Sequence, residues 1–209
     1  MSRRRPASRA PKKPARRPGQ LRLIGGEHRR RRLPVLDSPG LRPTPDRVRE
    51  TLFNWLSGVT PGARVLDLFA GTGALGLEAL SRGAAGAVLV ERDARVARAL
   101  VDNLATLDIT RAEVVVDDAL RHLAGPPRAA TLAFVDPPFR QGLAGPCCEA
   151  LEAGWLDDEA WIYVETESEL DPEVPAGWSL HREVRAGDST GRLYRRRSTP
   201  GESPDGDAC

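Results

Sequence analysis

Most of this 209-residue chain alternates short apolar runs with amphipathic segments. Two parallel strands need a long crossover between them, usually a helix, so this alternation predicts a doubly wound, mostly parallel α/β sheet. The expected strands are 64–70, 87–91, 112–116, 132–135 and 161–165, and the expected helices are 74–82, 94–107, 119–123 and 143–153. Two last strands, 179–184 and 191–196, flank a turn at Gly187 and are expected to be antiparallel.

The part of the chain before this pattern has a different character. Residues 1–20 are rich in Arg, Pro, Lys and Ala and have little to bury, which predicts a disordered basic arm. Residues 21–60 are expected to form an extension made of a hairpin and a helix. The α/β domain then spans 61–197, and the polar residues 198–209 are expected to form a flexible tail.

Charge is divided unevenly along the chain. Residues 1–35 hold thirteen Arg or Lys and one Glu, whereas the remainder holds eighteen basic and twenty-eight acidic residues. A basic segment on a mildly acidic body favours a polyanionic partner, and nucleic acid above all. A solvated tail without a partner would have the same composition, so charge alone leaves both readings open.

Composition also excludes several classes of protein. No apolar run reaches the ~18 residues of a membrane helix, and the N-terminus lacks the apolar core of a secretory signal. The three cysteines, Cys147, Cys148 and Cys209, fit neither a disulfide framework nor a zinc site. We therefore expect a cytoplasmic protein, monomeric, without a bound metal and without a membrane partner.

The first predicted strand leads into a glycine-rich loop. Gly71, Gly73 and Gly76 fit the G-x-G-x-x-G pattern, which alone is compatible with a dinucleotide site. Asp67 stands four residues before the first glycine, where a carboxylate favours a ligand with an α-amino group over a pyrophosphate. We expect Asp67, Ala70, Gly71 and Gly73 to bind a cofactor; the alternative for Asp67 is that it ties down the loop.

The next two strands also end in carboxylates. Glu91, beside Arg92, can accept both hydroxyls of a ribose. Asp118, in preference to Asp117, can hold the amino group of an adenine whose ring is lined by Ala119. The alternative for each acid is an exposed residue at a strand end. Together the three strand ends outline an adenosine with an amino-acid tail, which favours S-adenosyl-L-methionine over NAD.

Asp136-Pro137-Pro138-Phe139 follows the buried strand 132–135 and is the candidate catalytic motif. The prolines make a stiff corner that lacks two backbone donors. An exocyclic amine is a poor nucleophile, because its lone pair is delocalised into the ring. The Asp136 carboxylate and a carbonyl of the proline turn can accept its two N–H bonds, while Phe139 stacks on the base. This motif predicts methylation of an amine on a planar group, by positioning and electrostatics.

The extension adds a hairpin and a helix to these elements. Its expected strands, 21–24 and 29–36, would present four consecutive arginines at 29–32. The expected helix, 46–56, has one apolar stripe, formed by Val48, Leu52, Trp55 and Leu56. Its second stripe is polar and consists of Arg47, Glu50 and Asn54, for which a solvated, ion-paired face is the alternative reading.

Four stretches resemble one known family, the bacterial methyltransferases that act on guanine N2 in 16S ribosomal RNA. These are class I S-adenosylmethionine-dependent enzymes of the N-P-P-Y / D-P-P-F group. The stretches are IGGE at 24–27, LRPTPDRVRETLFNWL at 41–56, GALGLEALSRG at 73–83 and FVDPPF at 134–139. The R-P-T-x-D-R-V-R-E segment is the most discriminating, because generic methyltransferases lack it. The resemblance covers 21–197.

This resemblance implies a Rossmann-like methyltransferase domain with a seven-stranded sheet whose C-terminal strand is antiparallel. It implies S-adenosyl-L-methionine as methyl donor, and 16S rRNA or the assembled small ribosomal subunit as partner. Asn54 would then contact the cofactor, and the expected substrate-binding residues are Arg30, Arg31, Arg42, Thr44, Arg47 and Glu50. Thr72 and Pro45 depart from the family pattern, where serine and threonine are common, and 1–20 lies outside the shared core.

Other activities remain open from the motifs alone. A DNA adenine-N6 methyltransferase uses the same grip on the amine but usually needs an added target-recognition region. A protein glutamine methyltransferase usually has Asn in place of Asp136. An inactive RNA-binding module on the same fold would not need the set formed by Asp67, Glu91, Asp118 and Asp136.

Overall fold

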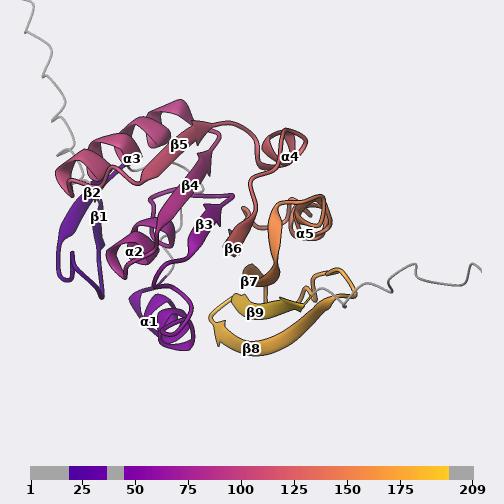
Figure 1. Ribbon diagram of the computed structural model, residues 1–209. Coiled ribbons are helices and arrows are strands. Elements are labelled where there is room, and N and C mark those ends of the chain that lie inside the picture. Colours follow the sequence, from indigo (N-terminus) through magenta and orange to yellow (C-terminus); the bar gives the residue numbers. More distant parts are fainter. Residues whose placement is uncertain (1–18, 37–44, 198–209) are drawn as a thin grey trace, which may run out of the picture.

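A seven-stranded sheet forms the centre of the protein, in the strand order β5-β4-β3-β6-β7-β9-β8 (Figure 1). The computed structural model describes residues 19–36 and 45–197. Strands β3 to β7 are parallel to one another, whereas β9 is antiparallel to both of its neighbours, β7 and β8. This arrangement confirms the predicted α/β sheet with its antiparallel C-terminal strand.

The bounds of the elements agree closely with the sequence pattern in the α/β part. The strands are β1 (Gly19–Arg22), β2 (Arg32–Val35), β3 (Arg64–Asp67), β4 (Gly86–Glu91), β5 (Ala112–Val116), β6 (Ala130–Val135), β7 (Leu156–Glu167), β8 (Trp178–Ala186) and β9 (Ser189–Arg197). The helices are α1 (Asp46–Trp55), α2 (Gly76–Ser81), α3 (Ala94–Thr106), α4 (Ala119–Leu123) and α5 (Ala144–Leu151).

The main differences lie at the ends of the chain's elements. The first strand begins at Gly19, inside the segment predicted to be a disordered arm. The second begins only at Arg32, because three of the four arginines belong to the turn before it. The rest of the predicted arm, residues 37–44 and the predicted tail 198–209 lie outside the described residues.

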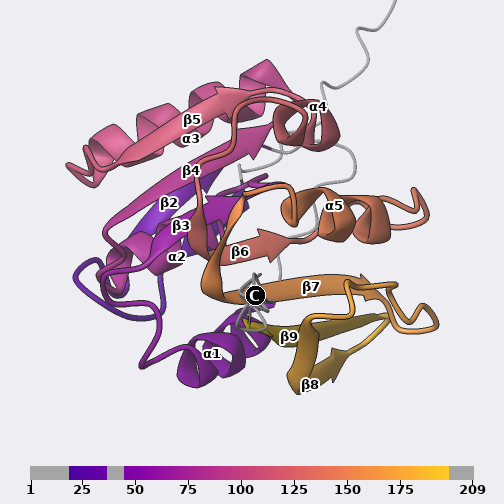
Figure 2. The ribbon, with the colours of Figure 1, turned by 45° about the vertical axis from the view of Figure 1, so that its right-hand side comes forward.

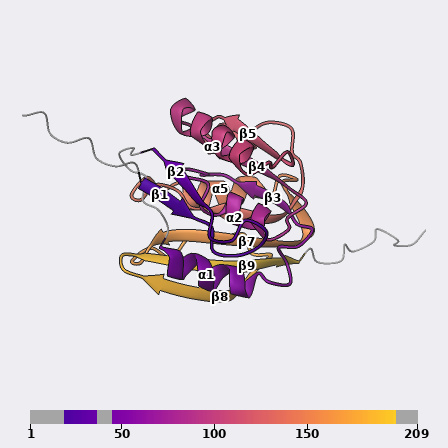
Figure 3. The ribbon, with the colours of Figure 1, turned by 90° about the vertical axis from the view of Figure 1, so that its left-hand side faces the viewer.

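Helices cover both faces of the sheet. The first core cluster joins β3 and β6 to α1, α2, α3 and the hairpin β1-β2, and Phe53 of α1 packs edge-on against Phe134 of β6. The second cluster lies on the other face, under α4 and α5. Figure 3 shows the first face, with the hairpin and the three helices in front of the strands. The site residues on strand ends are therefore held by two packed layers.

The hairpin crosses the helices of the first face and places its turn at the amino edge of the sheet. Helices α2 and α3 both run back from the carboxyl edge to the amino edge. The hairpin turn lies at their ends, since the Glu27 N–H donates to the Ser81 carbonyl at 2.7 Å and Arg31 donates to the Thr106 carbonyl at 3.0 Å. The end of β2 lies nearer the middle of α3, where the Asn103 amide donates to the carbonyl of Pro34.

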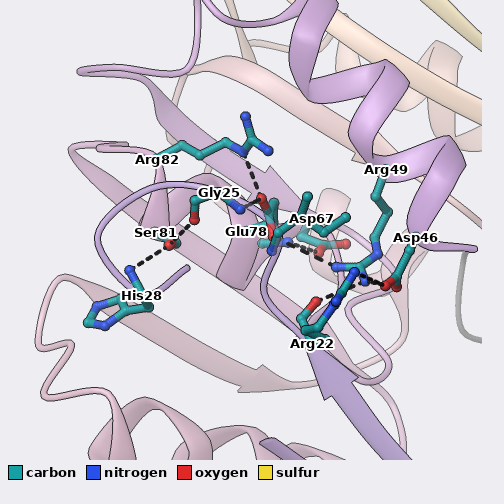
Figure 4. A network of polar contacts seen from close by, with 11 residues as sticks. Arg22, Gly25, His28, Asp46, Arg49, Asp67, Glu78, Ser81 and Arg82 are labelled. Atoms are coloured by element: carbon teal, nitrogen blue, oxygen red, sulfur yellow. Dashed lines mark hydrogen bonds and ion pairs between the residues drawn. The ribbon is translucent and has the colours of Figure 1, made fainter. Parts of the chain in front are cut away.

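A buried carboxylate fixes this extension to the domain (Figure 4). Glu78 of α2 is fully buried and accepts hydrogen bonds of 2.8 Å from the backbone N–H groups of Ile24 and Gly25. Arg82 donates to the same carboxylate at 2.7 Å, and a guanidinium nitrogen of Arg49 lies 3.8 Å from it. One side chain of α2 thus holds the hairpin turn and helix α1.

The turn itself requires glycine at one position. Gly26 has φ +74°, and a Cβ there would lie 1.8 Å from the Ser81 carbonyl oxygen. Ser81 also donates to the Gly25 carbonyl at 2.6 Å and accepts from the His28 N–H at 3.0 Å. The IGGE stretch is therefore a docking turn that fits against the end of α2.

Candidate active site

Asp67 and the glycine loop occupy the carboxyl end of β3. Asp67 is 2% exposed, and its Oδ2 accepts a 3.0 Å hydrogen bond from the Gly76 N–H. Burial raises the pKa of Asp67 to about 7, against the hydrogen bonds from the N–H groups of Gly76 and Phe69 and together with the charge of Glu91. One oxygen of this carboxylate thus ties down the loop, and the contact of Asp67 with a cofactor stays a prediction.

Glu91 lies at the same loop from the neighbouring strand β4. Its Oε2 accepts from the Gly71 N–H at 3.0 Å, and its Oε1 accepts from the Asp93 N–H at 2.8 Å. Gly71 and Gly73 have φ of +51° and +80°, values that suit glycine. The structure therefore brings Glu91 together with the predicted loop residues, and Arg92 beside it is exposed.

The two acids after β5 have different surroundings. Asp118 is exposed and caps α4, accepting through Oδ1 from the N–H groups of Leu120 and Arg121. Asp117 forms an ion pair with Arg121, and the hydrogen bond from that guanidinium lowers the pKa of Asp117. Both capping bonds use Oδ1 of Asp118, so its Oδ2 is the atom available to a ligand, and Ala119 behind it is buried.

The motif after β6 lies beside the glycine loop. Asp67 pairs with Phe134, and the Leu68 N–H donates to the Phe134 carbonyl at 3.1 Å, so Asp136 follows at the same edge. Asp136 is half-buried and Pro137 is buried, while Pro138 and Phe139 are half-buried. The motif and the predicted cofactor residues thus lie at neighbouring strand ends, and Phe139 of the motif is partly exposed.

The sequence reading missed two polar groups on β7, the strand on the other side of the motif. Tyr163 is buried, and its hydroxyl donates to Oε2 of Glu165 at 2.9 Å. Glu165 is 5% exposed and stands beside Asp136, since Val135 pairs with Val164. The signal was present, because Glu165 is the last residue of the predicted strand 161–165, just as Glu91 is the last residue of the predicted strand 87–91.

Several predicted contacts of the extension do not meet these strand ends. Asn54 is exposed in the last turn of α1, which leads to the amino end of β3, and its contact with the cofactor stays a prediction. Arg31 donates to the end of α3, and its neighbour Arg30 is exposed in the turn, with φ +69°. These arginines lie at the amino edge, opposite the site, because the hairpin turn points that way.

Helix α1 carries the other predicted substrate residues. Arg47 and Glu50 lie in its first half and are exposed. Arg49 was not predicted and is 1% exposed, donating to the Arg22 carbonyl at 3.0 Å and to Asp46 at 2.6 Å. The remaining two predicted contacts, from Arg42 and Thr44, lie outside the described residues.

The groups at the carboxyl edge fit an adenosine with an amino-acid tail. Carboxylates end β3 and β4 and follow β5, and they suit amino and hydroxyl donors but would repel a pyrophosphate. A Cβ on Gly73 would lie 2.6 Å from Leu77 and Leu100, so the loop stays close to α3. Among the described residues, no cluster of His, Cys, Asp and Glu could hold a metal ion, and no helix is long and apolar enough to span a bilayer.

Comparison with known proteins gives the family. The family model described as Conserved hypothetical protein 95 matches residues 21–195. Ribosomal RNA small subunit methyltransferase D of Escherichia coli K12 is 58% identical over 187 residues, which make up 88% of this chain and 94% of that protein. The chain belongs to this methyltransferase D family.

A second relative and a solved structure agree with this assignment. The methyltransferase D of Haemophilus influenzae is 44% identical over 182 residues, 85% of this chain and 94% of that protein. The solved structure of a methyltransferase candidate, yhhF from Escherichia coli, has a TM-score of 0.81 and 54% identity, covering 87% of this chain and all of that one. The predicted family and the class I fold are thereby confirmed.

Proposed function

We propose that this protein transfers a methyl group from S-adenosyl-L-methionine to the exocyclic N2 amine of a guanine in 16S rRNA of the small ribosomal subunit. The observation that carries the proposal is the position of Asp136-Pro137-Pro138-Phe139, one strand away from the glycine loop of β3. The names of the relatives support ribosomal RNA as the substrate class. We expect a cytoplasmic monomer that binds 16S rRNA or the assembled subunit.

The residues of this edge divide the work between them. S-adenosyl-L-methionine, when bound, supplies a methyl group on a positively charged sulfur. Asp67, Glu91 and Asp118 would hold its amino group, ribose and adenine. Asp136 and a carbonyl of the proline turn accept the two N–H bonds of the target amine and aim its lone pair, while Phe139 stacks on the base.

Atoms and charges balance without a further reagent. The N–C bond would form as the S–C bond breaks and the sulfur keeps the electron pair, while the proton that the methylated amine loses would pass to Asp136, which accepts its N–H bond. Asp136 stabilises the positive charge that develops on the amine, because a fixed carboxylate needs no reorganisation during transfer. A base in a helix must first leave its stack.

The test uses small subunits that lack this methylation and, in parallel, naked 16S rRNA. The full-length protein is incubated with labelled S-adenosyl-L-methionine, and the labelled nucleotide is identified by digestion and mass spectrometry. Label on guanine N2 supports the proposal, and the two arms show which form of the RNA is the substrate. Label on adenine, or none on either RNA, contradicts it.

A further inference from the structure

Glu165 is a buried carboxylate at the edge of the site. Its side chain is 5% exposed, and the hydrogen bond from Tyr163 is neutral. Within 19–36 and 45–197, no Arg, Lys or His forms an ion pair with it. Burying a carboxylate without a cation has a cost in free energy. This cost calls for a role beyond packing.

The strand register places this carboxylate next to the catalytic motif. Strands β6 and β7 lie side by side with their carboxyl ends at the same edge (Figure 2), and the pairs are Phe134 with Tyr163 and Val135 with Val164. Asp136 and Glu165 come next, about 4.8 Å apart along the sheet. Both follow the alternation onto the face that α1 covers, where Phe134 lies.

Tyr163 fixes the orientation of Glu165. Burial raises the pKa of Tyr163 well above its usual value, and the charges of Glu165 and Asp136 raise it further, so the hydroxyl remains a donor. Gly191 of β9 makes room for it, because a Cβ there would lie 2.1 Å from the Tyr163 oxygen. With Oε2 engaged by this hydroxyl, Oε1 is the atom that can meet a substrate.

A second carboxylate at this place distinguishes guanine from adenine. Beside its amine, guanine presents N1–H, a second donor on the same edge. Adenine presents N1 as an acceptor beside its amine, and a carboxylate facing that lone pair would repel it and leave both groups unpaired. The amine grip of Asp136 serves both bases, so the choice between them needs a group next to it.

We propose that Glu165 selects guanine by accepting the N1–H of the target base while Asp136 accepts from its N2 amine, with Tyr163 as the positioning residue. This inference rests on the proposed function and names the group that reads the base. It also accounts for a carboxylate that is buried at 5% exposure without a cation among the described residues.

The test replaces the target guanine by 2-aminopurine, which keeps the C2 amine but has an acceptor at N1. Small subunits are reconstituted with either base, and kcat/KM is measured for both. The wild-type protein should favour guanine by about 10- to 100-fold, the value of one charge-assisted hydrogen bond. Glu165→Gln keeps the shape of the side chain and can donate to the N1 of 2-aminopurine. Its kcat/KM on guanine should fall by about 10- to 100-fold, and the ratio of guanine to 2-aminopurine activity should narrow or invert.

Two further variants make the outcome decisive. Glu159→Gln changes an exposed glutamate at the other end of the same strand and should keep the wild-type ratio. Tyr163→Phe leaves Glu165 in place but unoriented and should narrow the ratio by about 3- to 10-fold. If Glu165→Gln does not fold, the Tyr163→Phe variant provides the test.

The results separate the two proposals. If the wild-type protein does not methylate small subunits that carry guanine at the target position, the proposed function is refuted. Wild-type activity with the same guanine to 2-aminopurine ratio in Glu165→Gln refutes the role of Glu165 and leaves the proposed function standing. Equal losses on both bases, with melting temperature and cofactor affinity kept, also contradict base selection by Glu165.

Discussion

Glu78→Gln should release the N-terminal extension from the domain. The carboxylate accepts from the N–H groups of Ile24 and Gly25 through different oxygens, and Arg82 shares one of them. A glutamine has one acceptor oxygen, so its amide nitrogen must face one of these donors. Since Glu78 is fully buried, water cannot replace the lost partner without opening the turn.

The size of the effect follows from two losses. One backbone N–H loses a hydrogen bond to a charged acceptor, worth about 1.5–3 kcal/mol. Arg49, 1% exposed, loses the negative charge 3.8 Å away and keeps only Asp46 as an acidic partner among the described residues. Breaking a buried pair typically costs about 3–5 kcal/mol, which lowers the melting temperature of a chain of this size by roughly 6–20 °C.

Hydrogen exchange and thermal melting measure these two consequences. Amides of 19–35 should exchange faster in Glu78→Gln, while those of β6 should change little at low temperature. Glu149→Gln, an exposed glutamate on α5, is the matched control and should leave both measurements unchanged. Wild-type protection of 19–35 together with a melting temperature within 2 °C or so of the control would show that Glu78 does not hold the extension.

Three further changes test the site. Asp136→Ala should abolish methylation and leave the dissociation constant of S-adenosyl-L-methionine within about twofold, because Asp136 contacts the target amine; normal turnover contradicts this. Glu91→Gln should raise the dissociation constant of S-adenosyl-L-methionine, measured by calorimetry, by roughly 10-fold or more, since Glu91 holds the Gly71 loop and would hold the ribose. An unchanged dissociation constant excludes Glu91 from the cofactor site. Asp67 has a pKa raised from 3.8 to about 7, so its contribution to stability is present below pH 4 and lost as pH rises through 7. Relative to Asp67→Asn, the wild-type free energy of unfolding should fall by up to about 4 kcal/mol over that range, and a flat difference refutes the shift.

The sheet was predictable because its signals are local. Apolar runs and helix stripes repeat from 64 to 196, and parallel strands bring their carboxyl ends to one edge whatever the loops do. That rule alone groups Asp67, Glu91, Asp118 and Asp136. The family resemblance implied a seven-stranded sheet with an antiparallel C-terminal strand. The position of β9 between β7 and β8 was not predicted, since local pattern does not give the order of strands in a sheet.

The extension was harder to predict because its direction depends on tertiary contacts. Four consecutive arginines suggested a surface facing the substrate, but the turn docks on α2 through Glu78 and Ser81 and so lies at the amino edge. Arg49 is of a residue type that is usually exposed on a helix. It can be buried here because it donates to the Arg22 carbonyl and to Asp46. Arg22 is 27 residues away in the sequence and Asp46 lies one helical turn away, so the local pattern does not show that both meet Arg49.

Helix α2 links the two halves of the protein that the site needs. Its first residue, Gly76, donates to Asp67 and so fixes the glycine loop, and Glu78, two residues later, holds the extension. A helix of six residues has no room to bend between these contacts. Any force that moves the hairpin turn or α1 therefore reaches the glycine loop through a rigid element. Linkage is reciprocal. A ligand that binds the glycine loop more tightly when the extension is docked must therefore also stabilise the docked extension.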